Sequence, residues 1–327
     1  MTKQSEVLND PKYIPVLDHG FIGLVETMGT DSSIVQAARV SYGDGTKTVL
    51  EDRGLIRYLM RHKHTSPFEM CQIKIHIKLP IFIMRQWVRH RTASLNEYSG
   101  RYSVMTDEFY MPAFEHIQPQ SSDNKQGRAG ELSDKTKEGV QWMLKASHEH
   151  SYSIYQALLG DRTDNMIYDP YGHGPDDESR LFDDDFPGIA RELARTVLPV
   201  ANYTELYWSQ NLHNMMHLMK LRMDPHAQYE IRVLAEALYK LIQPIFPNAI
   251  EAFDDYVRDS KSLSRMEVDL VKQLFSLTSM SPRDGLIMLY QTKKTEKEFA
   301  ESYGLSQREL KEFVQQWNLP SFAESKN

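Results

Sequence analysis

The chain has 327 residues, 41% hydrophobic and 25% charged, values typical of globular proteins that exclude a disordered or fibrous chain. Its 38 basic and 45 acidic residues give a net charge of −7, so neither duplex nucleic acid nor another large polyanion is expected as a main partner. The longest apolar run is about six residues and the N-terminus carries no signal-peptide pattern, so no membrane association is expected, and the single cysteine, Cys71, indicates a reducing, cytoplasmic compartment.

Several elements are predicted in the first part of the chain. Residues 31–40 and 55–62 show the apolar spacing of helices. Residues 71–79, CQIKIHIKL, alternate apolar and polar side chains and predict a half-buried strand that ends at Pro80. Residues 81–91 predict a helix that runs into a polar turn, TASLNEYSGRY.

The second part is expected to be mostly helical. A polar loop at 119–136 precedes a helix predicted at 138–159, and the stretch 160–188, with its acidic run, is interpreted as a surface insertion. From residue 189 onward helices are expected, and Ile231 to Ile242 has the spacing of an amphipathic helix. Within the tail, EFAESYGLSQRELKEFV resembles a helix–turn–helix, but its mixed charges favour a packing or assembly role over DNA binding.

The densest group of polar side chains lies at residues 86–102, QWVRHRTASLNEYSGRY. If this segment begins as a helix, Arg85 and Arg89 share one face, where like charges repel unless an anion or carboxylates lie between them. Arginine suits bidentate phosphate recognition, Gly100 allows close backbone approach, and Glu97 suits the polar edge of a base. The pattern alone fits a nucleotide site and, equally well, a solvated basic turn.

A second polar cluster, residues 211–230, raises the alternative of a zinc hydrolase. His213 and His217 share a helix face, and His226 or Glu230 could complete a zinc site. The zincin pattern requires a glutamate directly after the first histidine, where this chain has Asn214, so a polar pocket wall above a methionine-rich core is preferred. Cys71 lies on the apolar face of its strand, where a thiol is inert.

Five ordered motifs carry a resemblance to a known family. The spacing RHR-x7-S, from Arg89 to Ser99, marks the flavin-dependent thymidylate synthases, which this chain resembles over about residues 17–118 and 189–260. The motifs are HKHTSPFE (62–69), PIF-x2-RQW-x-RHR (80–91), S-x-NE-x-SGRY (94–102), AR-x-VLP (194–199) and LR-x-D-x-HAQ-x-E (221–230).

The resemblance implies a fold, a reaction and an assembly. The expected fold is α+β, an antiparallel or mixed sheet packed with helices, with a catalytic domain at 1–262 and a helical C-terminal extension at 263–327. The expected reaction makes dTMP from dUMP, with methylenetetrahydrofolate as carbon donor, FAD as hydride carrier and NADPH as reductant. The family's homotetramer has its sites at subunit interfaces. A nucleotide- or RNA-binding protein without catalysis is the alternative.

The resemblance also assigns residues. Arg222 matches the arginine that contacts the uracil ring and favours its ionised N3, which makes it the catalytic residue, and His64 matches a histidine near flavin and folate. Arg195 would arrive from a neighbouring subunit, and His213 stands where many members have arginine. No metal is implied. The dUMP-binding set is Gln86, Arg89, Glu97, Tyr98, Ser99, Gly100, Arg101, Arg195 and Arg222. The FAD-binding set is Ser66, Arg89, His90, Arg91, Glu97, Asn211, His213 and His217.

Overall fold

The computed structural model describes residues 1–7, 9–40, 49–122, 127–161, 182, 185–276, 282–291, 293, 295–303, 305, 307–317 and 319–321. The chain divides into two compact units, Met1–Arg258 and Asp259–Asn327, and the boundary expected after residue 262 lies close to this division. Most of the insertion expected at 160–188 lies outside the described residues.

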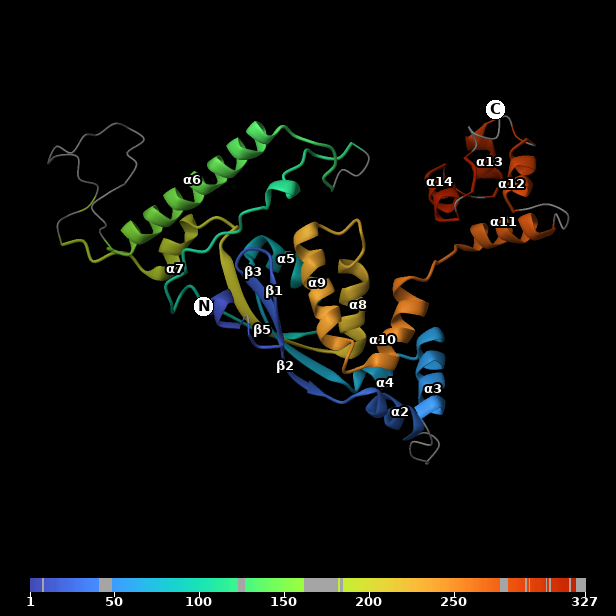
Figure 1. The fold of residues 1–327 in the computed structure, drawn as a ribbon, viewed down its shortest axis with the longest axis horizontal. Helices are drawn as coiled ribbons and strands as arrows, with labels where there is room; N and C mark the ends of the chain where they lie inside the picture. Colours follow the sequence, from blue (N-terminus) through green and yellow to red (C-terminus); the bar gives the residue numbers. More distant parts are fainter. Residues whose placement is uncertain are drawn as a thin grey trace. The chain divides into compact units, whose positions relative to one another are not determined.

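One antiparallel sheet forms the centre of the first unit (Figure 1). Every neighbouring pair of strands runs antiparallel, so the expected α+β class is confirmed, with an antiparallel rather than a mixed sheet. The order across the sheet is β1 (Tyr13–Val16), β2 (Gly20–Met28), β3 (Gln72–Pro80), β5 (Tyr203–Asn211) and β4 (Ser94–Glu97).

The strand predicted from alternation is β3, at the middle of the sheet. Its apolar residues, Ile73 to Leu79, are completely buried, as the period of two requires. The opposite face is covered as well: Lys78 is also completely buried, and its Nζ donates to Glu108 Oε2 and to the backbone oxygen of Thr2, each at 2.7 Å. The expectation of a half-buried strand is therefore wrong at this end, because residues from elsewhere in the chain pair with the buried ammonium.

The sequence does not predict strand β5, because the chain from residue 189 is expected to be mostly helical. Its inward side chains include two polar ones, Thr204 and Gln210, which weaken the alternating pattern. Each is buried at 2% exposure and finds a partner: Thr204 Oγ1 donates to Glu97 Oε1 at 2.7 Å, and Gln210 Nε2 donates to Thr92 Oγ1 at 3.1 Å. Buried polar groups with such partners are compatible with a core strand.

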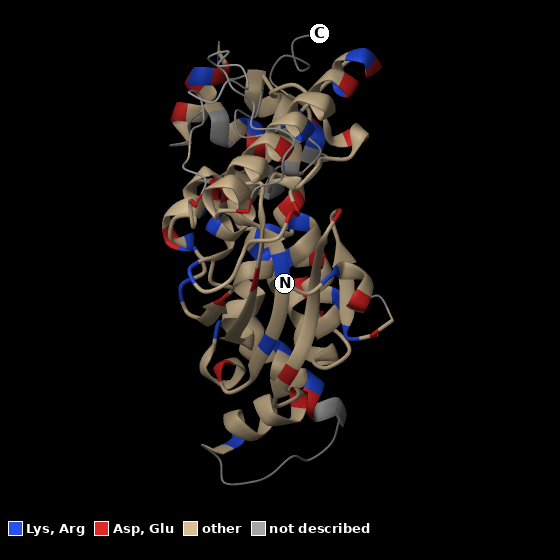
Figure 2. Ribbon diagram, turned by 90° about the vertical axis from the view of Figure 1, so that its left-hand side faces the viewer, with Lys and Arg blue, Asp and Glu red and all other residues tan. Residues whose placement is uncertain are grey.

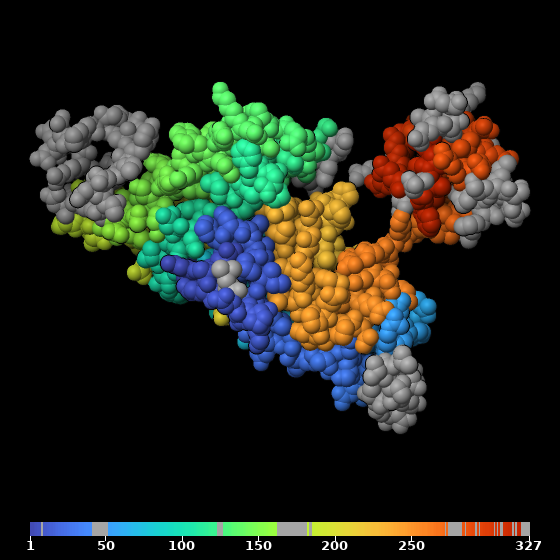
Figure 3. All heavy atoms as spheres, in the orientation of Figure 1, coloured from blue at the N-terminus to red at the C-terminus, as the bar shows by residue number. Residues whose placement is uncertain are grey.

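Helices pack on the apolar face of the sheet and form one core with it (Figure 1). Helix α9 carries the predicted amphipathic stripe, and Ile231, Leu234, Leu238 and Ile242 are all completely buried. The space-filling view shows α9 beside the N-terminal strands (Figure 3). The helices of this layer are α2 (Asp31–Arg39), α3 (Val49–Arg61), α4 (Ser66–Glu69), α5 (Ile81–Trp87), α8 (Leu212–Arg222), α9 (Tyr229–Ile242) and α10 (Pro247–Phe253).

The long helix α6 (Asp134–Leu158) begins four residues earlier than the expected start at 138. The cause is Ser133, whose side chain accepts a hydrogen bond from the backbone N–H of Thr136 and caps the helix. The polar loop predicted at 119–136 therefore ends before residue 134. The first unit also contains the short α-helices α1 (Gln4–Val7) and α7 (Arg191–Ala194), the 3-10 helices η2 (Phe114–His116) and η4 (Arg195–Val197), and the π-helix η5 (Asp254–Arg258).

The second unit is helical, as expected for the tail. It consists of α11 (Arg265–Ser276), α12 (Pro282–Gln291), α13 (Glu296–Ser302) and α14 (Gln307–Gln316). Buried apolar side chains, among them Leu270, Phe299 and Phe313, form its own core. Basic and acidic residues are interspersed along the ribbon (Figure 2). No described helix combines the length and the apolar character needed to cross a membrane.

Candidate active site

The arginine-rich segment leaves its helix earlier than the sequence suggested. Helix α5 ends at Trp87, not at residue 91, and a tight turn follows in which Arg89 N–H bonds to the Gln86 oxygen and His90 N–H to the Trp87 oxygen. Arg85 and Arg89 therefore do not share a helix face. The turn instead directs His90 inward, where it is 7% exposed, and leaves Arg89 exposed.

The buried imidazole of His90 orients an arginine. His90 Nε2 accepts from Arg222 Nε at 3.0 Å, and its ring lies edge-on to His217 at 6.0 Å between centroids. Burial, with the nearby Arg222 and His217, lowers the pKa of His90 to about 4. The ring is therefore neutral at physiological pH, and because Nε2 accepts, the proton of this tautomer belongs on Nδ1.

Arg222 is the last residue of α8. Its Nη2 donates to the Gln86 backbone oxygen at 3.4 Å, so two contacts fix the guanidinium plane. Burial and the charge of Arg89 lower the pKa of Arg222. Within the described part of the chain neither guanidinium pairs with a carboxylate, and such an arrangement favours a bound anion.

Several of the residues expected to hold FAD lie on this helix or on an element that packs against it. Asn211 caps α8, accepting from the Asn214 backbone N–H at 2.9 Å, and His213 and His217 follow in its first turns. Ser66 begins α4, which packs against α8. Arg91 is exposed just beyond the turn that holds His90.

His64, expected near flavin and folate, is exposed at the end of α3. Its ring lies 5.9 Å from that of Tyr58 and 6.3 Å from that of His62. These three rings form a small aromatic group of their own.

The groups proposed for zinc have other partners. His226 Nδ1 lies 2.9 Å from Asp224 Oδ1, and Glu230 is bound by Arg128 and Tyr110. Among the residues with described positions, no three histidine, cysteine or acidic side chains come together as metal ligands.

Strand β4 was expected to be part of a polar turn and is instead an edge strand. Its side chains are all exposed, so composition gave no strand signal, and only its pairing with β5, Ser94 opposite Ser209 and Glu97 opposite Leu206, defines it. Glu97 accepts from Thr204 Oγ1 at the end of the strand.

A second group of expected dUMP residues follows β4. The Tyr98 hydroxyl donates to the Val104 oxygen at 2.8 Å, and the Ser99 hydroxyl accepts from the Arg101 N–H at 3.3 Å. Gly100 is buried: an added Cβ would lie 3.1 Å from Arg195 Cδ and 3.0 Å from Met105 Sδ. Only glycine fits this approach without displacing its neighbours.

The expected residues thus fall into two groups on one chain. Arg195 lies against Gly100 of the same chain, so in a shared site these two would come together from one subunit, with Arg89 and Arg222 forming the other group. Arg101 is held at the surface, its Nε donating to Glu192 at 3.2 Å.

Gln228 was quoted in a motif but not assigned to the site, and the structure connects it there. Gln86 Nε2 donates to Gln228 Oε1 at 2.5 Å. Gln228 stands at the N-cap position of α9, and its side chain makes no capping bond. Its place in the motif LR-x-D-x-HAQ-x-E was the available sequence signal.

A buried neutral histidine, an oriented arginine and a glycine loop beside a further arginine, on an antiparallel α+β scaffold, are features that suit an anionic ligand. The family model described as "Thymidylate synthase complementing protein" matches residues 23–248. The chain belongs to this family, the flavin-dependent thymidylate synthases.

Named relatives support this membership. The flavin-dependent thymidylate synthase of Rickettsia bellii is 50% identical over 83% of this chain and 87% of its own length, and that of Ruegeria pomeroyi is 44% identical over 91% and 86%. A solved structure of the UMP/dUMP methylase PolB from Streptomyces cacaoi, bound with 5-Br dUMP, is 31% identical and covers 75% of this chain and 99% of that one, with a TM-score of 0.61.

Proposed function

We propose that the protein carries out the reductive methylation of dUMP to dTMP, with methylenetetrahydrofolate as carbon donor, FAD as flavin and NADPH as reductant. One observation supports this most directly. Arg222 is held by a neutral, buried His90, its pKa is lowered by burial and by the charge of Arg89, and no described carboxylate pairs with either arginine. This arrangement suits an anionic ligand whose base must be polarised.

Arg222 is the residue that would act on the base. In the unionised ring N3 carries a proton, and a guanidinium beside it stabilises the anion formed when that proton leaves. The anion increases electron density at C5, where the new carbon is attached. Since Nε and Nη2 are engaged by His90 and Gln86, Nη1 is the nitrogen of Arg222 that would bind the ligand.

A cysteine nucleophile is not part of this proposal. Burial, with the charge of Asp31, raises the pKa of Cys71 to about 11, so its thiol stays protonated at neutral pH. Cys71 is completely buried and its Sγ points to the Thr30 backbone oxygen.

The residues around α8 fit a ligand that carries a diphosphate. Arg89 and Arg91 supply cations, neutral His90 supplies an Nδ1–H donor, and Asn211 retains its amide N–H groups because its oxygen makes the helix cap. With Ser66, Glu97, His213 and His217 these residues would hold FAD. When bound, the flavin would supply hydride, and the protein would orient and polarise the reactants.

We further propose that the active site is shared between subunits of a homotetramer. Gly100 and Arg195 are in contact on the same chain and form one group, and Arg222, whose pKa is lowered by the charge of Arg89, forms the other with Arg89. A site built from one group of each subunit would combine the glycine loop at Gly100 with Arg222, the arginine that would act on the base.

The test is tritium release from [5-³H]dUMP in the presence of FAD, NADPH and methylenetetrahydrofolate, each omitted in turn. Release that needs every component supports the proposal. Folded protein that binds FAD and dUMP but releases no tritium would refute it and favour a nucleotide-binding protein without catalysis.

A further inference from the structure

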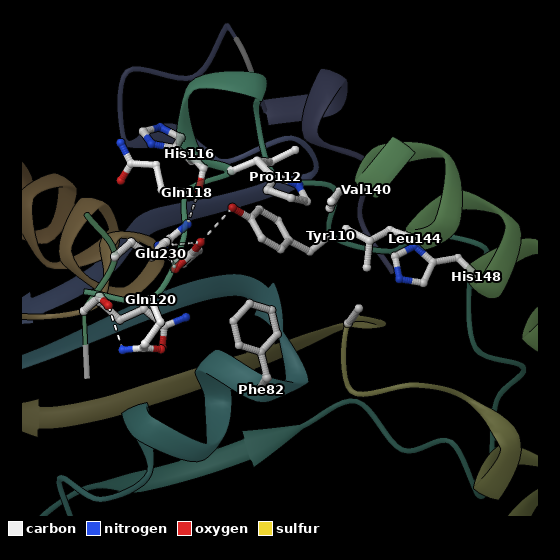
Figure 4. A pocket seen from close by; sticks show the side chains of 15 residues that line it. Phe82, Tyr110, Pro112, His116, Gln118, Gln120, Val140, Leu144, His148 and Glu230 are labelled. Atoms are coloured by element: carbon white, nitrogen blue, oxygen red, sulfur yellow. Dashed lines mark hydrogen bonds and ion pairs between the residues drawn. The ribbon is translucent and has the colours of Figure 1, made fainter. Parts of the chain in front are cut away.

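The most deeply buried carboxylate near the site has no role in the proposed chemistry. Glu230, in the first turn of α9, is 3% exposed, and Arg128 Nη2 donates to both of its oxygens, at 2.7 and 2.8 Å. The Tyr110 hydroxyl donates to Oε1 at 2.9 Å. Figure 4 shows this hydroxyl directed at the carboxylate, at the wall of a cavity of about 510 Å³.

The network keeps Glu230 charged. Burial by itself would raise its pKa, but the hydrogen bonds from Arg128 and from the backbone of Glu230, with the charge of Arg128 and the Gln228 side chain, outweigh burial and hold the pKa below its usual range. A buried ion pair contributes little net stability compared with apolar packing, so its presence next to the site suggests a role beyond stability.

The charge of Glu230 determines the orientation of two amides in series. An ionised carboxylate only accepts hydrogen bonds, so the Gln228 side chain can bond to Glu230 only through its NH₂ group. Gln228 Oε1 then faces Gln86 and accepts from its Nε2 at 2.5 Å. Gln86 Oε1 is left as the group presented to a ligand. Amide orientation follows here from the hydrogen-bond network, with the carboxylate as its fixed end.

We propose that Glu230 and Arg128 form a positioning pair for the nucleotide. Through Gln228 they fix Gln86 so that its carbonyl oxygen, an acceptor, faces an N–H or O–H donor of the nucleotide. This inference rests on the proposed dUMP-binding function. Gln86 is the residue that contacts the nucleotide; Glu230, Arg128 and Gln228 act only through it. A neutral side chain at position 230 no longer requires a donor from Gln228. The side-chain amides of Gln228 and Gln86 can then adopt either orientation.

The test uses the FAD-loaded enzyme and measures the Kd of dUMP by calorimetry, together with kcat and KM. Glu230→Gln keeps the size of the side chain and removes the charge. We expect Kd and KM for dUMP to rise about tenfold, the effect of one lost hydrogen bond, while kcat stays within about twofold. Gln228→Met, which interrupts the series of contacts from Glu230 to Gln86, should have the same effect. The double variant should bind dUMP no more weakly than either single variant.

Tyr110→Phe is the matched control. It removes a hydrogen bond from the same carboxylate but leaves the series of contacts from Glu230 to Gln86 intact, so its dUMP affinity should equal that of the wild type, although its thermal stability falls. Equal weakening in Tyr110→Phe, or wild-type affinity in Glu230→Gln, would overturn the inference. If Glu230→Gln does not fold, the dUMP affinity of Gln228→Met is the deciding measurement. Wild-type affinity in that variant would also overturn the inference. Wild-type enzyme that fails to bind dUMP would instead refute the proposed function.

Discussion

Protonation of His90 should destabilise the protein in a defined pH range. The imidazole has a pKa of about 4 in the folded chain and its ordinary value of 6.5 in the unfolded chain. Between these values the unfolded chain binds a proton that the folded chain does not, so stability rises with pH. This contribution is complete above about pH 6.5 and is lost as pH falls through about 4.

The magnitude follows from the two pKa values. At about pH 4.5 the unfolded state gains about 2.5 kcal/mol from protonating this side chain, relative to neutral pH. The structural cause is the bond from Arg222 Nε to His90 Nε2, which an imidazolium cannot accept, in addition to the loss of hydration at a site 7% exposed.

Urea unfolding at about pH 7 and pH 4.5, at one fixed subunit concentration, measures this effect. His90→Gln is the control, because its amide oxygen can accept from Arg222 and does not titrate. The wild type should lose about 2.5 kcal/mol more than His90→Gln over this interval. Equal losses in the two proteins, or an NMR titration of His90 near 6.5, would show that the imidazole is not held neutral by its surroundings.

Three further predictions concern the proposed reaction. Arg222→Ala should retain FAD but lose about a hundredfold or more in kcat, since the cation beside the base is removed; turnover like that of the wild type would exclude the role. Inactive Arg195→Ala and Arg89→Ala subunits, mixed under conditions of verified exchange, should regain part of the activity, because some sites receive both intact groups, and no recovery would count against shared sites. Cys71→Ala should keep turnover. In the folded wild type Cys71 should resist thiol reagents, because the pKa of its thiol is about 11. Loss of turnover in the variant together with rapid modification of the wild type would contradict this.

The part of the fold that was predicted from sequence is the part with clean periodicity. The alternation at 71–79 and the stripe from Ile231 to Ile242 gave β3 and α9, because each buries one continuous apolar face. Strands β4 and β5 were not predicted. The first is a short exposed edge, and the second buries Thr204 and Gln210, whose partners, Glu97 and Thr92, lie far away in sequence.

The site was predicted in part for the same reason. Resemblance to the family named the polar residues, and the chain belongs to that family. It did not show that His90 is buried or that Arg195 lies against Gly100, because both facts depend on where α5 ends and on contacts across the fold. Gln228 gained importance only through its contact with Gln86.

The position of β4 sets a limit on changes in chain length. The strand occupies residues 94–97, within the interval that separates RHR at 89–91 from Ser99, and it is paired residue by residue with β5. A single insertion or deletion there would shift Ser99 and its loop by about 3.3 Å and would turn Glu97 to the opposite face of the sheet. The length of the seven-residue spacer therefore fixes the position of Ser99 relative to RHR. We expect this interval to accept substitutions at its exposed side chains far more readily than any change in its length.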